Sequence, residues 1–268
     1  MIIIGIDIGG STTKIISLDN KRLLSPMQVK AHDPITSVYG AFGKYISENN
    51  MSISDIDKIM VTGVGSTFIK ENIYDIPTFH VPEFNALGLG GLYLSGLENA
   101  IIVSMGTGTA FVKAEGSRMT HIGGTGVGGG TLLGLSSKLL NLQEFDSLVT
   151  LSADGVLDNV DLTVGDISKT GVSTMPKKTT ASNFGKISDY ATKNDIAKGL
   201  INMVFQTIGM MAVFACRIDN TKEVVLCGNL TTIPQAKEIF DGIKDLHDIN
   251  FYLPAQAEYA TAIGAALY

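Results

Sequence analysis

Two stretches about a hundred residues apart share one pattern, a β-branched run that ends at a glycine turn. The first is IIIGIDIGGSTTK over residues 2–14, and the second is AIIVSMGTG over residues 100–108. Each run is too short to span a membrane and is predicted to be a buried strand that enters a hairpin turn at its glycines. Another strand follows each turn. The chain is therefore predicted to contain two related halves that each present one such turn to a shared site.

The first turn carries the groups that a nucleotide phosphate and its magnesium ion need. Glycines let backbone N–H groups approach an anion, hydroxyls donate hydrogen bonds, and a lysine adds positive charge. Asp7, at the end of the strand, is suited to hold Mg²⁺ directly or through water. For this stretch alone, an ordinary β-turn with a solvated aspartate is the alternative. The predicted nucleotide and metal residues here are Asp7, Gly9, Gly10, Ser11, Thr12, Thr13 and Lys14.

Composition limits the classes of protein to which the chain can belong. Its 268 residues, 45% hydrophobic and 17% charged, suit two α/β domains, which we divide as 1–95 and 96–268. A net charge of -6 argues against binding to nucleic acid. Cys216 and Cys227 fit no metal or redox spacing and are predicted to fill the core. With no secretion signal and a polar-interrupted apolar segment over 200–216, a cytoplasmic protein without a membrane partner is expected.

The first half alternates strand and helix patterns, as in an α/β domain with a largely parallel sheet. Asp33 and Pro34 mark a helix start, Ser66 is expected to cap a short helix running to Tyr74, and a strand is predicted over 76–81. Glu83 follows that strand, at the edge where such sheets place their sites. A carboxylate there is suited to take the proton from a substrate hydroxyl that attacks a γ-phosphate. A glutamate that only complements the helix dipole is the alternative.

A glycine segment lies in the second predicted domain, at residues 123–130. Six of the eight residues from Gly123 to Gly130 are glycines, and a helix is predicted directly after them, over 131–140. Because so many glycines cost conformational entropy, the segment is expected to let its backbone approach a ligand. The helix would aim its first N–H groups at the same place, and the amides of Gly130 and Thr131 are expected to offset charge on a phosphoryl group. A flexible linker is the alternative.

The remainder of the chain yields coarser predictions. Residues 154–184 form a long polar stretch, which is interpreted as a cover or dimer-contact segment with a small strand near 162–164. Asn194 is expected to cap a long helix over 195–217, whose apolar residues on all sides indicate burial or a place in a subunit interface. A further strand over 223–227 ends at Gly228 and Asn229.

Several of these motifs resemble those of a known family. Asp7–Lys14 and Gly106–Thr109 resemble the two phosphate loops of the actin, hexokinase and sugar-kinase superfamily. Together with 81–86, 122–130 and 181–185, in this order, they resemble the type II pantothenate kinases over nearly the whole chain. The resemblance implies two actin-like (ribonuclease H-like) α/β domains with a nucleotide cleft between them. It further implies a homodimer that uses ATP and Mg²⁺ to phosphorylate the primary hydroxyl of pantothenate, the first step of coenzyme A synthesis.

The resemblance also implies roles for individual residues. Glu83 matches the family's catalytic base. The acceptor side is assigned to His121, Thr109 and Gly123. Besides 7–14, the residues that match ATP contacts are Thr107, Gly108, Gly129, Gly130, Thr131, Leu132, Leu133, Phe145 and Asn229.

One position departs from the family pattern. His121 stands where the family usually has an arginine that is implied to grip the substrate carboxylate. An imidazole offers one donor in place of a charged bidentate fork, so the exchange is expected to weaken carboxylate binding or to change the substrate. Arg118, three residues earlier, is a candidate to compensate, although a solvated turn residue is the simpler interpretation.

Three functions remain open from the sequence. The first is a pantothenate kinase, and the second is a kinase of another small hydroxylated metabolite, which His121 keeps open. The third is a non-kinase ATPase of the same fold that activates an iron–sulfur partner. This last class needs cysteines that can hold a cluster at a dimer interface, and Cys216 and Cys227 are poor candidates for that.

Overall fold

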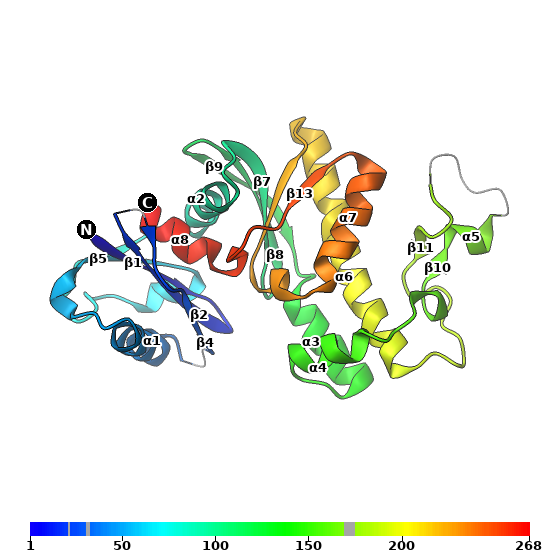
Figure 1. Ribbon diagram of the computed structural model, residues 1–268, viewed down its shortest axis with the longest axis horizontal. Helices are drawn as coiled ribbons and strands as arrows, with labels where there is room; N and C mark the ends of the chain where they lie inside the picture. Colours follow the sequence, from blue (N-terminus) through cyan, green and yellow to red (C-terminus); the bar gives the residue numbers. More distant parts are fainter. Residues whose placement is uncertain (21, 31–32, 169–174) are drawn as a thin grey trace.

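The N-terminal lobe is built on a mixed sheet, shown at the left of Figure 1. The structure is a computed structural model and describes residues 1–20, 22–30, 33–168 and 175–268. The first two strands form the predicted hairpin, in which the N–H of Gly9 donates to the carbonyl of Thr12 over 3.0 Å. The sheet order is β3-β2-β1-β5-β6 with β4 also paired to β2, the strands being β1 (Ile2–Ile8), β2 (Thr12–Asp19), β3 (Arg22–Leu23), β4 (Met27–Lys30), β5 (Ile56–Thr62) and β6 (Thr78–His80).

The C-terminal lobe repeats this plan in a second sheet. An antiparallel hairpin, β7–β8, lies beside a parallel neighbour, β12, just as the hairpin β1–β2 lies beside the parallel strand β5. The predicted internal repeat is therefore present in the fold. The sheet order is β13-β12-β7-β8-β9, the strands being β7 (Asn99–Met105), β8 (Thr109–Glu115), β9 (Arg118–Thr125), β12 (Glu223–Cys227) and β13 (Asn250–Tyr252).

Two helices cross between the lobes and hold them together. Helix α2 (Glu83–Ser95) follows the first sheet but packs on β7, β8, β9 and β12, whereas α8 (Ala260–Leu267) follows the second sheet but packs on β1, β2 and β5. The two helices lie against each other between the sheets (Figure 1). A Cβ at Gly90 would lie 1.8 Å from the carbonyl oxygen of Ala260, and one at Gly264 would lie 1.7 Å from that of Ala86. Only glycine permits this closeness. The division after residue 95 stays a prediction.

The outer faces of both sheets are covered by amphipathic helices. Helix α1 (Pro34–Glu48) buries Phe42 and Tyr45 on the first sheet, and Asp33 accepts from the Thr36 N–H over 3.1 Å, which confirms the predicted cap. The second sheet is covered by α6 and α7, while α3 and α4 lie near the lobe junction (Figure 1). These helices are α3 (Gly129–Leu140), α4 (Phe145–Ser152), α6 (Lys193–Asp219) and α7 (Gln235–His247).

Helix α6 is the long apolar helix that the sequence predicted. Among the described residues it is the one helix long and apolar enough to cross a membrane, but 61% of its most apolar stretch is buried inside the protein. Such burial is what a core helix requires. The predicted cap at Asn194 is wrong, because the hydroxyl of Thr192 accepts from the Asp195 N–H over 3.3 Å and the helix begins one residue before Asn194.

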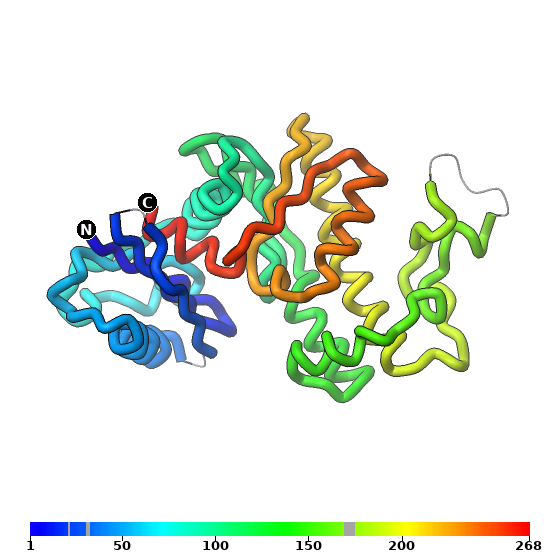
Figure 2. Tube along the Cα trace, viewed as in Figure 1, coloured from blue at the N-terminus to red at the C-terminus, as the bar shows by residue number. Residues whose placement is uncertain are grey.

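Residues 154–168 and 175–192 project beyond α6 at the right of Figures 1 and 2. Two buried aspartates fix them to that helix: Asp161 accepts from Asn202 of α6 over 2.7 Å, and Asp195 of α6 accepts from the Val156 N–H over 2.7 Å. The small strand predicted here is β10 (Leu162–Thr163), which pairs with β11 (Thr180–Ser182) beside α5 (Val164–Ile167). Residues 169–174 of the predicted cover segment lie outside the described residues.

Two predictions of local structure are corrected. The helix expected over 66–74 is only a short 3-10 helix, Val64–Phe68, because the carbonyl of Ile69 bonds the His80 ring over 3.0 Å instead of continuing a helix. The glycine segment is not a free loop at its start. Its first residues, 123–125, form the end of edge strand β9 (Arg118–Thr125), which is paired to β8.

Candidate active site

The two glycine turns meet at the junction of the lobes. The hydroxyl oxygens of Ser11 and Thr107 are 3.5 Å apart, although 96 positions separate these residues in the chain. Beside them, the amide nitrogen of Asn229 lies 3.5 Å from the hydroxyl of Thr12, 217 positions away. Because each residue stands at or next to a strand end, the fold brings one turn from each lobe to a single place.

Asp7 is the acidic centre of this place. It lies directly opposite Lys14 in the β1–β2 pair, and Lys14 is 6% exposed. Burial raises the pKa of the Asp7 carboxyl, and the opposite charge of Lys14 only partly offsets that rise. Burial likewise lowers the pKa of the Lys14 ammonium, against the attraction of Asp7 and then Glu258. Both charged groups are therefore poorly solvated, and a charged ligand bound beside them would reduce the cost of this desolvation.

Glu83 stands at the first position of α2, close enough to sense Asp7. Partial desolvation raises the pKa of its carboxyl, and the negative charge of Asp7 raises that pKa further. The residue as a whole is nevertheless exposed, so its carboxyl remains accessible. A carboxylate with a raised pKa at an accessible position is what a general base requires.

Gly63 makes room for the Asp7 carboxylate. Its backbone has a φ of 85°, and a Cβ at this position would lie 2.5 Å from Oδ1 of Asp7. In the chain, Gly63 directly follows strand β5. A second requirement for glycine, the contact with a carboxylate from another strand, becomes visible only in three dimensions.

The glycine segment supports the second turn from behind. The carbonyl oxygens of Gly106 and Thr107 accept from the N–H groups of Gly129 and Gly130 over 2.8 and 2.9 Å. The role predicted for the Gly130 amide, an N–H aimed at a phosphoryl group, is therefore wrong in this structure, because that hydrogen is already donated within the protein. The Thr131 hydroxyl donates to the carbonyl of Gly126 over 3.0 Å and so stabilises the same segment.

Other predicted nucleotide residues divide into two groups. Phe145, at the start of α4, lies 3.1 Å from the position of a Cβ on Gly129, and Leu230 lies 3.5 Å from it, so three separate segments gather here next to Asn229. Leu133 is half-buried, whereas Leu132 is fully buried in the core. The side chain of Thr13 is buried on the α1 face of the sheet, because neighbouring residues of a strand point to opposite faces. Neither Leu132 nor Thr13 directs its side chain to the junction.

The predicted acceptor residues lie beside Glu83, with one exception. His121 stacks on Phe84, the residue that follows Glu83, with ring centroids 4.0 Å apart. Gly123, with a φ of 146°, lies two residues further along β9. Thr109 is different, since its buried hydroxyl donates to the carbonyl of Val127 over 2.8 Å and is not free for an acceptor.

Phe84 and an ion pair between the lobes were missed in the sequence. Phe84 stood beside a candidate base, and that proximity was the available signal. Lys30 of β4 and Glu144, just before α4, form an ion pair of 3.3 Å across the junction. No local pattern marks such a pair, because its members are 114 positions apart.

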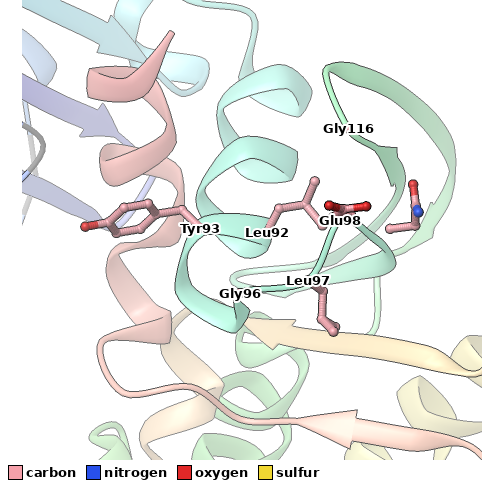
Figure 3. A pocket seen from close by; sticks show the side chains of 7 residues that line it. Leu92, Tyr93, Gly96, Leu97, Glu98 and Gly116 are labelled. Carbon is pink, nitrogen blue, oxygen red and sulfur yellow. The ribbon is translucent and has the colours of Figure 1, made fainter.

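A hollow of about 500 Å³ lies elsewhere, at the opposite end of α2 (Figure 3). Since α2 rises about 1.5 Å per residue over its length, this hollow is roughly 18 Å along the helix from Glu83 and is separate from the candidate site. Its lining residues are Leu92, Tyr93, Gly96, Leu97, Glu98, Asn99 and Gly116.

Curated relatives match most of the chain. A type II pantothenate kinase from Bacillus cereus strain G9842 is 29% identical over 99% of this chain and 97% of its own length. One from another Bacillus cereus strain is 32% identical over 85% of this chain and 84% of its own length.

Solved structures of low sequence identity share the fold. An activator of 2-hydroxyisocaproyl-CoA dehydratase from Clostridium difficile, with bound ADPNP, matches with a TM-score of 0.69 at 19% identity, covering 100% of this chain and 94% of its own. A ROK family glucokinase from Streptomyces griseus, in complex with glucose and AMPPNP, matches with a TM-score of 0.62 at 12% identity, covering 99% of this chain and 98% of its own. These likenesses confirm the predicted fold, a pair of actin-like α/β domains.

The family is settled by two independent matches. The sequence model of the Fumble family covers residues 99–238, slightly more than half of the chain. The relatives described above extend the match to the N-terminal lobe, where the first turn and Glu83 lie. This chain belongs to the Fumble family, the type II pantothenate kinases.

Proposed function

We propose that this protein transfers the γ-phosphoryl group of ATP, with Mg²⁺, to the primary hydroxyl of pantothenate, the first step of coenzyme A synthesis. The observation that carries the proposal is the meeting of the two glycine turns beside two interacting carboxylates, Asp7 and Glu83. Family membership supplies the acceptor. Phosphoryl transfer needs positioning and charge stabilisation more than covalent chemistry, and this junction is equipped for both.

The two turns would hold the triphosphate between the lobes. Gly10 and Ser11 offer backbone and hydroxyl donors from one side, and Thr107 and Gly108 do so from the other. The N–H of Gly9 already donates to the carbonyl of Thr12 and shapes the first turn instead. Lys14 adds a positive charge whose solvation is already reduced by burial. Phe145 and Asn229 would contact the nucleoside end of ATP; their support is that Phe145 lies beside Gly129 and Asn229 beside Thr12 of the first hairpin.

Asp7 fits a magnesium ion that is shared with the phosphates. Mg²⁺ is usually bound through one or two carboxylates, substrate phosphates and waters, so a cage of three protein ligands is not required. No such group of three occurs among residues 1–20, 22–30, 33–168 and 175–268. The raised pKa of Asp7 means that a neighbouring cation would be favourable, and Gly63 keeps the space around its carboxylate open. Bound there, Mg²⁺ would neutralise charge on the β- and γ-phosphates.

Glu83 would act as the base in this reaction. Its carboxylate takes the proton of the acceptor hydroxyl while the hydroxyl oxygen forms a bond to the γ-phosphorus. The bond from that phosphorus to the oxygen bridging to the β-phosphate breaks, and ADP leaves with the electron pair. Because desolvation, and then the charge of Asp7, raise the pKa of Glu83, the base is stronger than an ordinary glutamate.

The Glu83→Gln variant tests the proposal. We expect kcat for ADP release with pantothenate to fall by about 10²–10⁴-fold, while the Kd for an ATP analogue stays unchanged. Glu98→Gln is the control, since Glu98 lies at the other end of α2 beside the hollow. Unchanged kcat in Glu83→Gln would remove Glu83 as the base, and absence of pantothenate-dependent ADP release in the wild type would remove the proposed substrate.

A different small hydroxylated acceptor is the second candidate, favoured by His121 in place of the family arginine. An ADP-release panel of hydroxylated acids, amines and sugars that includes pantothenate separates the two. Activation of an iron–sulfur partner is not favoured. Cys216 and Cys227 are both buried, and burial raises the pKa of each thiol to about 12, the opposite of what thiolate ligands need.

We also propose that the protein works as a homodimer in the cytoplasm. Support for self-association comes from large apolar side chains exposed on the projecting segment and at the end of α6, with Tyr190 at 91% and Ile218 at 84%. Light scattering after gel filtration measures the mass directly. A value near the 28.4 kDa of one chain would contradict the dimer.

A further inference from the structure

The stacked pair of Phe84 and His121 is the feature from which a substrate preference is inferred. The two rings are almost parallel, with an angle of 3° between their planes and 4.0 Å between their centroids. Phe84 is 36% exposed and His121 is exposed, so the pair is not a core contact. Phe84 adjoins Glu83 in the chain, and successive Cα atoms are about 3.8 Å apart. The pair therefore lies within one small molecule's length of the proposed base.

His121 lies two residues after Met119 on edge strand β9, so strand alternation puts both side chains on the α2 face, and a β-bulge follows His121. In the β8–β9 pair, Phe111 stands opposite Gly123 while Val112 stands opposite His121, so Ile122 is the extra residue. Bulges re-aim side chains and are common beside active sites. Four residues along α2 from Phe84, Gly88 meets Met119 of the same strand, where a Cβ would lie 2.1 Å from the sulfur. Helix α2 thus runs along β9, and the two contacts fix His121 against Phe84.

The charges around the pair do not suit a carboxylate. Glu83, next to Phe84 in the chain, is acidic, and the charge of Asp7 reaches it as well. Arg118 does not compensate. It is adjacent to Met119, which faces α2, so Arg118 points to the other face of the sheet. It also lies about 10 Å along the strand from His121.

We propose that the Phe84–His121 pair selects the acceptor by the end remote from its hydroxyl, and that it favours a planar uncharged amide over a free carboxylate. The outer side of the stacked pair offers a flat surface and one ring donor or acceptor, which match the plane and polarity of an amide. It supplies no fixed bidentate cation, which is what a carboxylate binds best. This inference rests on the proposed kinase function and narrows its acceptor class.

The test compares pantothenate with its amide, in which only the charged end is changed. For the wild type, kcat/KM for ADP release is expected to be at least as high with the amide as with pantothenate. His121→Arg is expected to shift the ratio at least about tenfold toward pantothenate, because a charge-assisted bidentate contact replaces a neutral surface. Phe84→Leu keeps an apolar side chain but removes the stack, and should raise KM for both acceptors with little change in kcat.

Arg118→Gln is the matched control, since it removes a cation from the opposite face of the same strand and should leave the ratio unchanged. If His121→Arg melts at a much lower temperature than the wild type, His121→Gln is used in its place. Because glutamine is also uncharged, the ratio of kcat/KM between the amide and pantothenate should then stay near the wild-type value. A wild-type preference for pantothenate of tenfold or more would overturn the inference while leaving the kinase proposal intact. So would a His121→Arg ratio equal to that of the wild type. No ADP release with either acceptor would overturn the kinase proposal itself.

Discussion

The two hairpins have the same backbone but offer different chemistry. Two residues before each glycine turn stand Asp7 in the first hairpin and Ser104 in the second, and their cross-strand partners are Lys14 and Ala110. The first hairpin therefore brings a pair of opposite charges to the junction, a half-buried Asp7 and a buried Lys14. The second brings hydroxyls and backbone carbonyls, two of which accept the first N–H groups of α3.

A second pair of matching positions, Gly63 and Gly228, shows the same contrast between a charged contact in the first lobe and an uncharged one in the second. Gly63 and Gly228 both follow a strand that runs parallel to the first hairpin strand, and both have positive φ, 85° and 90°. A Cβ at Gly63 would meet the Asp7 carboxylate as well as the backbone of Ile8, whereas the atoms nearest to one at Gly228 are backbone atoms of Met105. The repeated frame thus explains the fold, and the charged residues carried by one copy explain where chemistry is concentrated.

The largest effect on catalysis is expected from replacing Asp7, whereas replacing Ser104, the matching residue of the second hairpin, should have little effect. Asp7→Asn should lower kcat/KM by about a hundredfold or more, because it removes the charge proposed to act through Mg²⁺ on the reacting phosphates. Ser104→Ala should change it by less than about threefold, within the effect of one lost neutral hydrogen bond. Steady-state ADP release measures both. Equal losses in the two variants would contradict the division between the hairpins.

The two glycines give the next largest effect. Gly63→Ala and Gly228→Ala should each destabilise the protein by about 1–3 kcal/mol, since each forces alanine into a strained conformation. Urea unfolding measures this loss. When activity is corrected for the fraction of folded protein, only Gly63→Ala should show a loss, because its methyl group displaces the Asp7 carboxylate. Gly134→Ala is the control: nothing lies within 4 Å of its Cβ on α3, so stability should be unchanged or slightly higher. Full specific activity in Gly63→Ala would be inconsistent with this account.

A smaller effect is expected in the pH dependence of stability. Burial raises the pKa of Asp7 above 3.8, so the folded state is penalised once the carboxyl ionises. Asp7→Asn removes that penalty, and its melting temperature should exceed the wild-type value at pH 7. The difference should shrink as pH falls through the raised pKa and vanish below 3.8, where both states are protonated. Glu83→Gln should show the same sign, because its pKa is raised too. A lower melting temperature for Asp7→Asn at pH 7 would show that the Lys14 attraction dominates.

The sequence predicted what depends on local pattern and left out what depends on long-range contact. Short stretches of sequence predicted the turn glycines, the Asp33 cap and the repeat of the two hairpins, and all of these are present in the structure. The packing of α2 on the second sheet and of α8 on the first was not predicted. The small residues of these helices are required only because the two helices contact each other closely, which the local sequence does not show.

The candidate site shows the same limit at single residues. A motif assigns a run of residues together, but a strand turns alternate side chains away, and so Thr13 of the first turn faces α1 instead of the junction. The Gly130 amide was assigned from its place at a helix start, and the structure occupies it with a carbonyl from a turn that is 23 positions earlier in the chain. The stacking of His121 on Phe84 depends on helix α2 lying along β9, a long-range contact that no periodicity in the sequence reveals.

The smallest effect concerns the ion pair that joins the lobes at the surface. Lys30 and Glu144 are 75% and 68% exposed, so their 3.3 Å contact is worth about 0.2–1 kcal/mol and is screened by salt. If closure of the lobes over ATP uses this contact, Lys30→Gln should raise KM for ATP by at most about fivefold at low ionic strength, with no difference from wild type in 0.5 M salt, roughly the range where screening is strong. Lys237→Gln is the control, because it breaks an equally exposed pair with Asp241 inside α7 that joins no lobes. An increase in KM that persists at high salt would mean that Lys30 acts on the nucleotide itself and not through Glu144.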